Sequence, residues 1–259
     1  MRKQRADLLL LQQGLVESRA LAQRLVMAGQ VRADGQVILK PSSMIPENAI
    51  LLIDPGPRFV SRGGDKLECA FESFSLDVTG KVCADVGAST GGFTDCMLQR
   101  GAERVYAIDV GKGILHWKLR QDSRVFVLED TNARYIEYLP EPVHFVSVDV
   151  SFISLKIILP VVRAWLSPSG GVVVALIKPQ FEAGRSQVSR GDGVIRDSEI
   201  HRQVLLDVLG FAQENGYSVH GIVQSPLLGP KGNVEFLAHL SYPGERIVDI
   251  SNMVENKVG

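Results

Sequence analysis

Runs of apolar, β-prone residues alternate with segments of helical periodicity along most of the chain. Seven such runs predict strands, at Val82–Val86, Arg104–Asp109, Val125–Leu128, His144–Asp149, Gly171–Ile177, Ser218–Gln224 and Glu235–Leu240. This alternation is typical of an α/β fold, a Rossmann-like doubly wound sheet of seven mainly parallel strands. The connection between the last two runs, at 226–231, is too short for a crossover helix and therefore predicts an antiparallel pair.

A different pattern precedes this body. Apolar residues at helical spacing predict helices over Arg5–Gln13 and Ser18–Ala28, the second one ending at Gly29. Short β-prone runs follow at 31–32, 37–39 and 50–53, and two prolines around a glycine in Asp54–Phe59 indicate a connector. We therefore expect a small α+β domain over 1–54, a linker over 55–61, the α/β domain over 62–242 and a C-terminal tail over 243–259.

Composition is ordinary for a globular protein, but charge is unevenly distributed. Of 259 residues, 45% are hydrophobic and 22% are charged. Residues 1–40 carry seven basic and three acidic side chains, a balance of +4, so the net charge of -1 leaves -5 for the remainder. A basic head on a mildly acidic body suggests that the head meets a polyanion.

Cysteine usage and hydropathy indicate an intracellular protein. Cys69, Cys83 and Cys96 show no CxxC spacing, lie where small apolar residues belong and are interpreted as reduced core thiols. The start of the chain lacks the apolar run of a secretion signal, and the most apolar stretch, 143–162, is interrupted by charged residues and Pro160. The five histidines lack metal-ligand spacing, so no metal is assigned. We expect a cytoplasmic protein with no membrane association.

A glycine-rich loop follows the first predicted strand of the body. Residues Asp85–Thr94 read Asp-Val-Gly-Ala-Ser-Thr-Gly-Gly-Phe-Thr and open a helix, where glycine lets the backbone approach a ligand closely. The spacing is neither GxGxxG nor GxxxxGK[ST], which disfavours dinucleotide and phosphate-cradling sites. Asp109 ends the next strand, where a carboxylate can accept hydrogen bonds from a ribose, and Asp130 ends the third, beside the expected adenine.

The head resembles the S-four domain, an RNA-binding module named after a small-subunit ribosomal protein. The resemblance rests on Arg5–Leu8, Glu17–Ala22 and Leu25–Val31. It implies that Arg5, Arg19 and Arg24 contact RNA phosphates, which would make binding salt-dependent without reading sequence. The alternative is that these arginines only solvate helix faces. The module also occurs on pseudouridine synthases and tyrosyl-tRNA synthetases, but the signature motifs of those enzymes are absent from the chain.

Four charged residues, here called the tetrad, lie in further motifs: Lys66 in Ser61–Leu67, Asp149 in Val148–Phe152, Lys178 in Leu176–Glu182 and Glu235 in Lys231–Leu237. With the glycine loop, these motifs resemble the TlyA family of S-adenosylmethionine-dependent ribosomal RNA 2′-O-methyltransferases, whose catalytic domain is related to FtsJ. The resemblance implies a catalytic tetrad, S-adenosylmethionine as cofactor, and ribosomal RNA or ribosomal subunits as partner. It implies cofactor binding by Asp85, Gly87, Ser89, Thr90, Gly91, Gly92, Phe93, Asp109 and Asp130.

Methyl transfer to a ribose hydroxyl requires a base, because the pKa of the hydroxyl is far above neutral. The resemblance implies that Lys178 serves the hydroxyl; a lysine can do so only where burial and a neighbouring cation lower its pKa, and Lys66 is the candidate neighbour. Asp149 and Glu235 would orient the lysines. Phe152 either stacks on the target base, as in the family, or packs in the core. The polar stretch Phe181–Gly193 is expected to be a mobile substrate flap.

Three interpretations remain open at this point. The leading one is an enzyme that methylates a ribose 2′-hydroxyl of ribosomal RNA, with cytidine as the target that the family suggests. The second is a noncatalytic RNA-binding assembly factor with a relic cofactor loop, which the intact tetrad argues against. The third is a hemolysin, a name the family has carried, which the missing secretion signal and pore element disfavour. The target nucleotide, the ribosomal subunit and the oligomeric state are not determined by the sequence.

Overall fold

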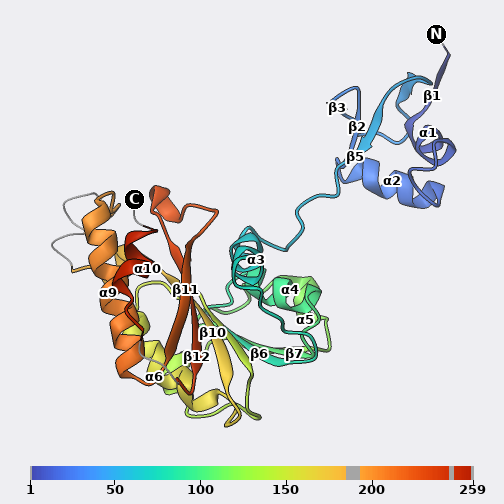
Figure 1. Cartoon of the computed structure of the whole chain (residues 1–259). Coiled ribbons are helices and arrows are strands. Elements are labelled where there is room, and N and C mark those ends of the chain that lie inside the picture. The colour runs from blue at the N-terminus through green and yellow to red at the C-terminus, as the bar shows by residue number, and fades with distance from the viewer. Residues whose placement is uncertain (1, 185–192, 245–247, 258–259) are drawn as a thin grey trace. The chain divides into compact units, whose positions relative to one another are not determined.

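The computed structural model describes residues 2–184, 193–244 and 248–257, and the chain divides into two compact units, Met1–Arg58 and Phe59–Gly259 (Figure 1). The predicted linker, residues 55–61, contains this division. Most of the predicted flap, residues 185–192, lies outside the described residues; its first residues belong to a short helix, α7 (Pro179–Glu182).

The first unit packs two helices against short strands. Helices α1 (Ala6–Gln12) and α2 (Arg19–Met27) follow the predicted helical spacing, and Ser18 caps α2 by accepting the Leu21 N–H at 3.2 Å. The antiparallel order β3-β2-β5 is formed by β2 (Val31–Ala33), β3 (Gln36–Val37) and β5 (Leu51–Ile53). A second pair, β1 (Lys3–Arg5) with β4 (Met44–Pro46), was not predicted, because β1 is entirely polar and β4 ends in a proline, so neither is a run of β-prone residues.

The second unit is built on a seven-stranded sheet of order β11-β12-β10-β9-β6-β7-β8. Its strands are β6 (Val82–Val86), β7 (Arg104–Ile108), β8 (Val125–Leu128), β9 (Phe145–Val148), β10 (Gly171–Ile177), β11 (Ser218–Gln224) and β12 (Phe236–Tyr242). Only β12 runs against its neighbours, β10 and β11, which confirms the predicted mainly parallel sheet with an antiparallel last pair.

Helices cover both faces of this sheet (Figure 1). One face carries α3 (Gly63–Phe74), α4 (Gly92–Gln99) and α5 (Trp117–Arg120), which bury Leu67, Phe71, Met97 and Leu119. The other carries α6 (Leu155–Trp165), α9 (Ser198–Glu214) and α10 (Ser251–Glu255), which bury Leu159, Leu205 and Val254. Short 3₁₀ turns η1 (Ala133–Tyr135) and η2 (Pro230–Gly232) complete the described elements.

The cysteines follow the core prediction only in part. Cys83 and Cys96 are buried, and burial raises the pKa of the Cys83 thiol to about 12, which makes it a poor nucleophile. Cys69 is only half-buried, with its Sγ beside Ser73 Oγ on α3, so the core prediction is wrong for this residue. In the described ranges no helix combines the length and apolarity needed to span a bilayer.

Candidate active site

The topology of the sheet brings three members of the tetrad to one edge. Asp149 follows β9 and Lys178 follows β10, at the carboxyl ends of neighbouring parallel strands. Glu235 precedes β12, whose reversed direction places its start at that same edge, opposite the end of β10. Lys66 lies in the first turn of α3. Strand order reverses next to β9, between β9 and β6, where open α/β sheets bind ligands.

The tetrad forms two ion pairs. Lys178 Nζ lies 2.5 Å from Asp149 Oδ1 and donates a hydrogen bond of 3.1 Å to Ser151 Oγ. Lys66 Nζ donates to Glu235 Oε2 at 2.6 Å. Glu235 is fully buried and the Lys178 side chain is 9% exposed, so each charge depends on its partner for stability. Asp149 thus contacts Lys178 and Glu235 contacts Lys66, as expected of carboxylates that orient the two lysines, while the role of Lys66 as the neighbouring cation of Lys178 stays a prediction.

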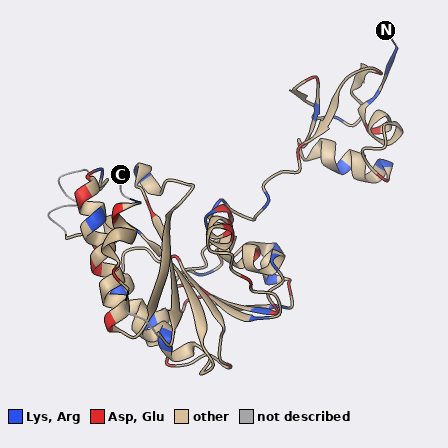
Figure 2. Ribbon diagram, viewed as in Figure 1, with Lys and Arg blue, Asp and Glu red and all other residues tan. Residues whose placement is uncertain are grey.

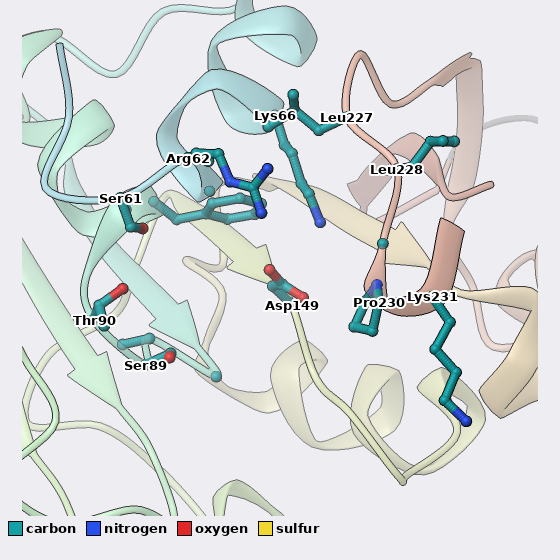
Figure 3. Close-up of a pocket in the computed structure, with 16 residues that line it drawn as sticks. Ser61, Arg62, Lys66, Ser89, Thr90, Asp149, Leu227, Leu228, Pro230 and Lys231 are labelled. Atoms are coloured by element: carbon teal, nitrogen blue, oxygen red, sulfur yellow. The ribbon is translucent and has the colours of Figure 1, made fainter. Parts of the chain in front are cut away.

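A cavity of about 500 Å³ lies beside these pairs (Figure 3). Figure 3 shows Lys66 and Asp149 directed into it, with the segment Leu227–Lys231 on the opposite side from Ser89 and Thr90. Gly92 and Phe93 of the glycine loop also line it, as does Arg62. Sequence analysis did not anticipate Leu227–Lys231 as a wall, because a short connection between two strands carries no signal of its own.

A second cavity, of about 650 Å³, lies on the other side of the glycine loop. It is lined by Asp109, Asn132 and Phe152, among others, and shares Gly87, Ser89 and Asp149 with the first cavity. Gly87 has φ of +85°, and a Cβ there would overlap the carbonyl oxygen of Asp149. The loop thus approaches the Asp149 backbone at a distance that only glycine allows, beside residues that line both cavities.

The two strand-end acids differ in their surroundings. Asp109 accepts the Ser89 N–H on Oδ2 and the Gly111 N–H on Oδ1, both at 2.7 Å, so it holds the glycine loop while lining the second cavity. Asp130 is exposed, has φ of +53° and lines neither cavity. Its neighbour Glu129, which the sequence analysis missed, accepts the N–H groups of Gly113, Ile114 and Leu115.

Asp85 and Gly91 shape the glycine loop without lining either cavity. Asp85 is fully buried and lines neither cavity; it accepts hydrogen bonds from Thr94 Oγ1 at 2.7 Å and Ser147 Oγ at 3.0 Å. These bonds join the start of the loop to α4 and β9. Gly91 has φ of +96°, and a Cβ there would collide with Leu119. Desolvation raises the pKa of Asp85 to about 7, against the opposing effect of its hydrogen bonds.

This pKa predicts a pH dependence of stability. The ordinary value is 3.8, so between pH 3.8 and about 7 the folded chain retains a proton that the unfolded chain releases. The contribution of Asp85 is therefore fully present below pH 3.8 and lost as pH rises through 7. Urea unfolding from about pH 4 to 8 should show wild-type stability declining relative to Asp85→Asn, with no further decline above neutrality. A difference that stays constant would mean that Asp85 is ionised in the folded protein.

The first unit has its own charged cluster. Asp7 is fully buried and accepts hydrogen bonds of 3.0 Å from Arg5, Arg19 and Gln23. Chiefly the Arg5 hydrogen bond holds the pKa of Asp7 well below its usual range. Basic positions colour β1 and α2 in Figure 2; Arg24 on α2 is exposed. Arg5 and Arg19, two of the three arginines predicted to bind RNA, thus also donate hydrogen bonds to the buried Asp7 carboxylate, which the sequence analysis had not singled out.

Phe152 lies between Asp149 and the start of α6. It is 90% exposed and has φ of +64°, a conformation that bulky side chains rarely adopt. Its ring centroid is 4.8 Å from that of Phe181 on α7. The alternative that Phe152 packs in the core is wrong, while base stacking stays a prediction.

Within 2–184, 193–244 and 248–257, no three His, Cys, Asp or Glu side chains gather as potential metal ligands.

Comparison with known proteins identifies both parts of the chain. Residues 59–242 match the FtsJ-like methyltransferase family and residues 4–51 the S4 domain. The chain is 43% identical over 256 residues to a Mycobacterium tuberculosis protein named 16S/23S rRNA (cytidine-2′-O)-methyltransferase TlyA, covering 97% of this chain and 95% of that one.

Solved structures share the architecture. A Streptococcus thermophilus protein, provisionally named a hemolysin, is 48% identical with a TM-score of 0.75, covering 100% of this chain and 95% of its own. A Listeria monocytogenes protein, provisionally named an S-adenosylmethionine-dependent methyltransferase, has a TM-score of 0.53 at 15% identity, covering 70% of this chain and 99% of its own. At that identity the likeness shows the fold alone.

Proposed function

The chain belongs to the TlyA family, which joins an S4 domain to an FtsJ-like methyltransferase domain, and on this premise we propose that it methylates a ribose 2′-hydroxyl of ribosomal RNA, using S-adenosylmethionine. The observation that carries the proposal is the Lys178–Asp149 ion pair, whose Asp149 lines both cavities. The name of the Mycobacterium tuberculosis relative supports cytidine as the target nucleoside.

The glycine loop and its neighbours fit the cofactor. Gly87 and Ser89 border both cavities with little side-chain bulk, and the Asp109 carboxylate at the second cavity can accept hydrogen bonds from a ribose. Asp149, which lines both cavities, adds a negative charge there, which suits a positively charged sulfonium. Bound S-adenosylmethionine would supply an electrophilic methyl group there. Asp85 and Gly91 would hold the loop in shape without touching the cofactor.

Lys178 is the candidate base for the ribose hydroxyl. Asp149 and Ser151 fix its Nζ at one position. Because the Asp149 carboxylate favours the charged amine, the base role requires that the positive sulfonium beside Asp149 offset this effect, so that a neutral amine could accept the hydroxyl proton as the oxygen attacks the methyl group. Lys66, held by Glu235, lines the first cavity and could donate a hydrogen bond to the attacking ribose or to the RNA backbone. Glu235 is the buried counter-charge that keeps Lys66 in that orientation.

The S4 domain is the proposed RNA-binding part of the chain, and replacing Arg24 or Arg19 in it should have different effects on stability. Arg24→Ala should weaken binding to ribosomal subunits and lower the slope of log affinity against log salt by about 1, without changing thermal stability, because Arg24 is exposed. Arg19→Ala should weaken binding and also destabilise the domain, because the buried Asp7 loses a partner. Salt titrations of binding and melting curves test this contrast. Equal melting temperatures for the two variants would contradict it.

The direct test of function is methylation of isolated ribosomal subunits with methyl-labelled S-adenosylmethionine. Each subunit is assayed alone, and the product RNA is hydrolysed with alkali, which cannot cleave after a 2′-O-methylated nucleotide. Label retained in an alkali-resistant dinucleotide supports ribose methylation and identifies the nucleoside. Label on a base or on protein would overturn the proposal. Bound cofactor with no label on either subunit would favour the noncatalytic assembly factor.

A further inference from the structure

Glu182 is the last residue of α7, which follows Lys178, but its carboxylate binds the start of α6. Its Oε2 accepts the Ser154 hydroxyl at 2.6 Å and its Oε1 accepts the Leu155 N–H at 2.8 Å. Both groups lie at the start of α6, which follows Asp149 in sequence. Sequence analysis included Glu182 in the motif around Lys178, but the proposed chemistry gives it no role.

Residues 149–155 are therefore held from both ends by one short segment. Lys178 binds Asp149 and Ser151 at the beginning, and Glu182 binds Ser154 and Leu155 at the end. These contacts come from residues 178–182, which follow β10, and they connect two neighbouring strand ends. The Lys178–Asp149 ion pair and the Glu182 hydrogen bonds, together called the brace here, hold residues 149–155 at both ends.

Phe152 lies inside that brace in a strained conformation. A non-glycine residue in the left-handed region persists only where surrounding contacts determine it, and such strain concentrates at functional sites. An exposed ring contributes little burial to offset its strain, since Phe152 is 90% exposed. The contact with Phe181, which precedes Glu182, comes from the same holding segment, residues 178–182. The hydrogen bonds of Glu182 are thus among the interactions that can maintain this conformation.

We infer that Glu182 is a positioning residue, which holds residues 149–155 so that the Phe152 ring is presented to RNA before the substrate arrives. This inference rests on the proposed function and adds a preformed stacking platform to it. A preformed platform avoids ordering the loop on binding, so its loss should appear mainly in RNA recognition. The competing explanation is that Glu182 only caps α6 and stabilises the fold.

The test combines Glu182 and Phe152 variants of the full chain in methylation of ribosomal subunits. Glu182→Ala should raise KM for the subunit about tenfold, the size expected for the loss of a pair of partly buried hydrogen bonds to a charged group, with cofactor affinity unchanged. Glu182→Gln should recover most of this loss, because an amide oxygen still accepts the Leu155 N–H. In a Phe152→Ala background, Glu182→Ala should raise KM by less than about twofold, because the platform is already absent.

Asp77 provides a matched control. Its carboxylate also accepts one backbone N–H and one hydroxyl, both from Thr79, at 2.9 and 2.7 Å, in a turn between α3 and β6. Asp77→Ala should lower the melting temperature without changing KM for RNA. If Glu182→Ala behaves in the same way, or if its effect on KM is equally large with and without Phe152, the positioning role is overturned.

The two proposals fail in different ways. If wild type methylates the subunit and Glu182→Ala leaves KM unchanged, only the positioning role of Glu182 is overturned. No methylation by wild type would overturn the proposed function, and the same double-mutant comparison would then be made with the dissociation constant for ribosomal subunits. Coupling between Glu182 and Phe152 in that constant would still support a preformed RNA platform, and additive effects would exclude it.

Discussion

Replacing Lys178 with alanine is expected to reduce methyl transfer by about 10²- to 10⁴-fold while S-adenosylmethionine still binds. Lys178 Nζ is the proposed proton acceptor, held by Asp149 and Ser151 at the end of β10. The Lys178 side chain meets the two cavities only at Asp149, which lines both, while the glycine loop and Asp109 form the rest of the proposed cofactor site and should stay in place when the side chain is removed. Single-turnover rates on a ribosomal subunit and calorimetric titration of the cofactor measure the two effects separately.

Lys178→Arg separates proton transfer from charge. The guanidinium retains a positive charge that can pair with Asp149, but it does not release its proton in proteins. If Lys178 is the base, Lys178→Arg should therefore be about as inactive as Lys178→Ala. Recovery of activity with arginine would instead assign Lys178 an electrostatic role.

Lys156 is the matched control for this series. It is a lysine on α6 that pairs with Asp207 of α9, and this partner lines neither cavity, whereas Asp149, the partner of Lys178, lines both. Lys156→Ala should keep activity within about twofold of wild type, since exposed ion pairs contribute little. Activity of Lys178→Ala within tenfold of wild type, in folded protein, would contradict the proposed mechanism.

The strands could be predicted because parallel sheets bury both faces of each strand. Gly171–Ile177 is a continuous apolar run, and the observed β10 has those bounds. The approximate location of Asp149 and Lys178 followed from the same pattern, because Asp149 ends one predicted strand and Lys178 follows another. Which carboxylate holds which lysine could not be predicted. It depends on β10 lying between β9 and β12, and sequence spacing contains no information about that order.

Carboxylates that organise loops were the main omission. Glu129 and Glu182 near the candidate site, and Asp7 in the first unit, each accept several hydrogen bonds from groups that include distant ones, such as Arg19 for Asp7 and Leu155 for Glu182. A carboxylate that organises a loop has no periodicity, and in sequence it resembles any surface acid. Local patterns therefore predicted the elements, while the contacts that hold the site together required the tertiary structure.

Replacing Gly87 with alanine is expected to weaken S-adenosylmethionine binding by at least about 100-fold, with a similar loss of methyl transfer. A Cβ at Gly87 would overlap the carbonyl oxygen of Asp149 and lie 2.9 Å from its carbonyl carbon. That carbonyl cannot yield freely, because the Asp149 N–H donates to Val86 O at 2.8 Å and its side chain holds Lys178. The clash must therefore displace either the proposed cofactor loop or the ion pair. Calorimetric titration of the cofactor and subunit methylation measure both consequences.

Gly80→Ala separates this clash from backbone strain. Gly80 has φ of +67°, close to the +85° of Gly87, but a Cβ there would meet nothing within 4 Å. Both substitutions carry the cost of a left-handed alanine, about 1 kcal/mol, which should lower the melting temperature of both variants. Only Gly87→Ala should lose cofactor binding. If the two variants bind S-adenosylmethionine equally well, the close approach of Gly87 to Asp149 does not shape the cofactor site, and the proposed role of the glycine loop is overturned.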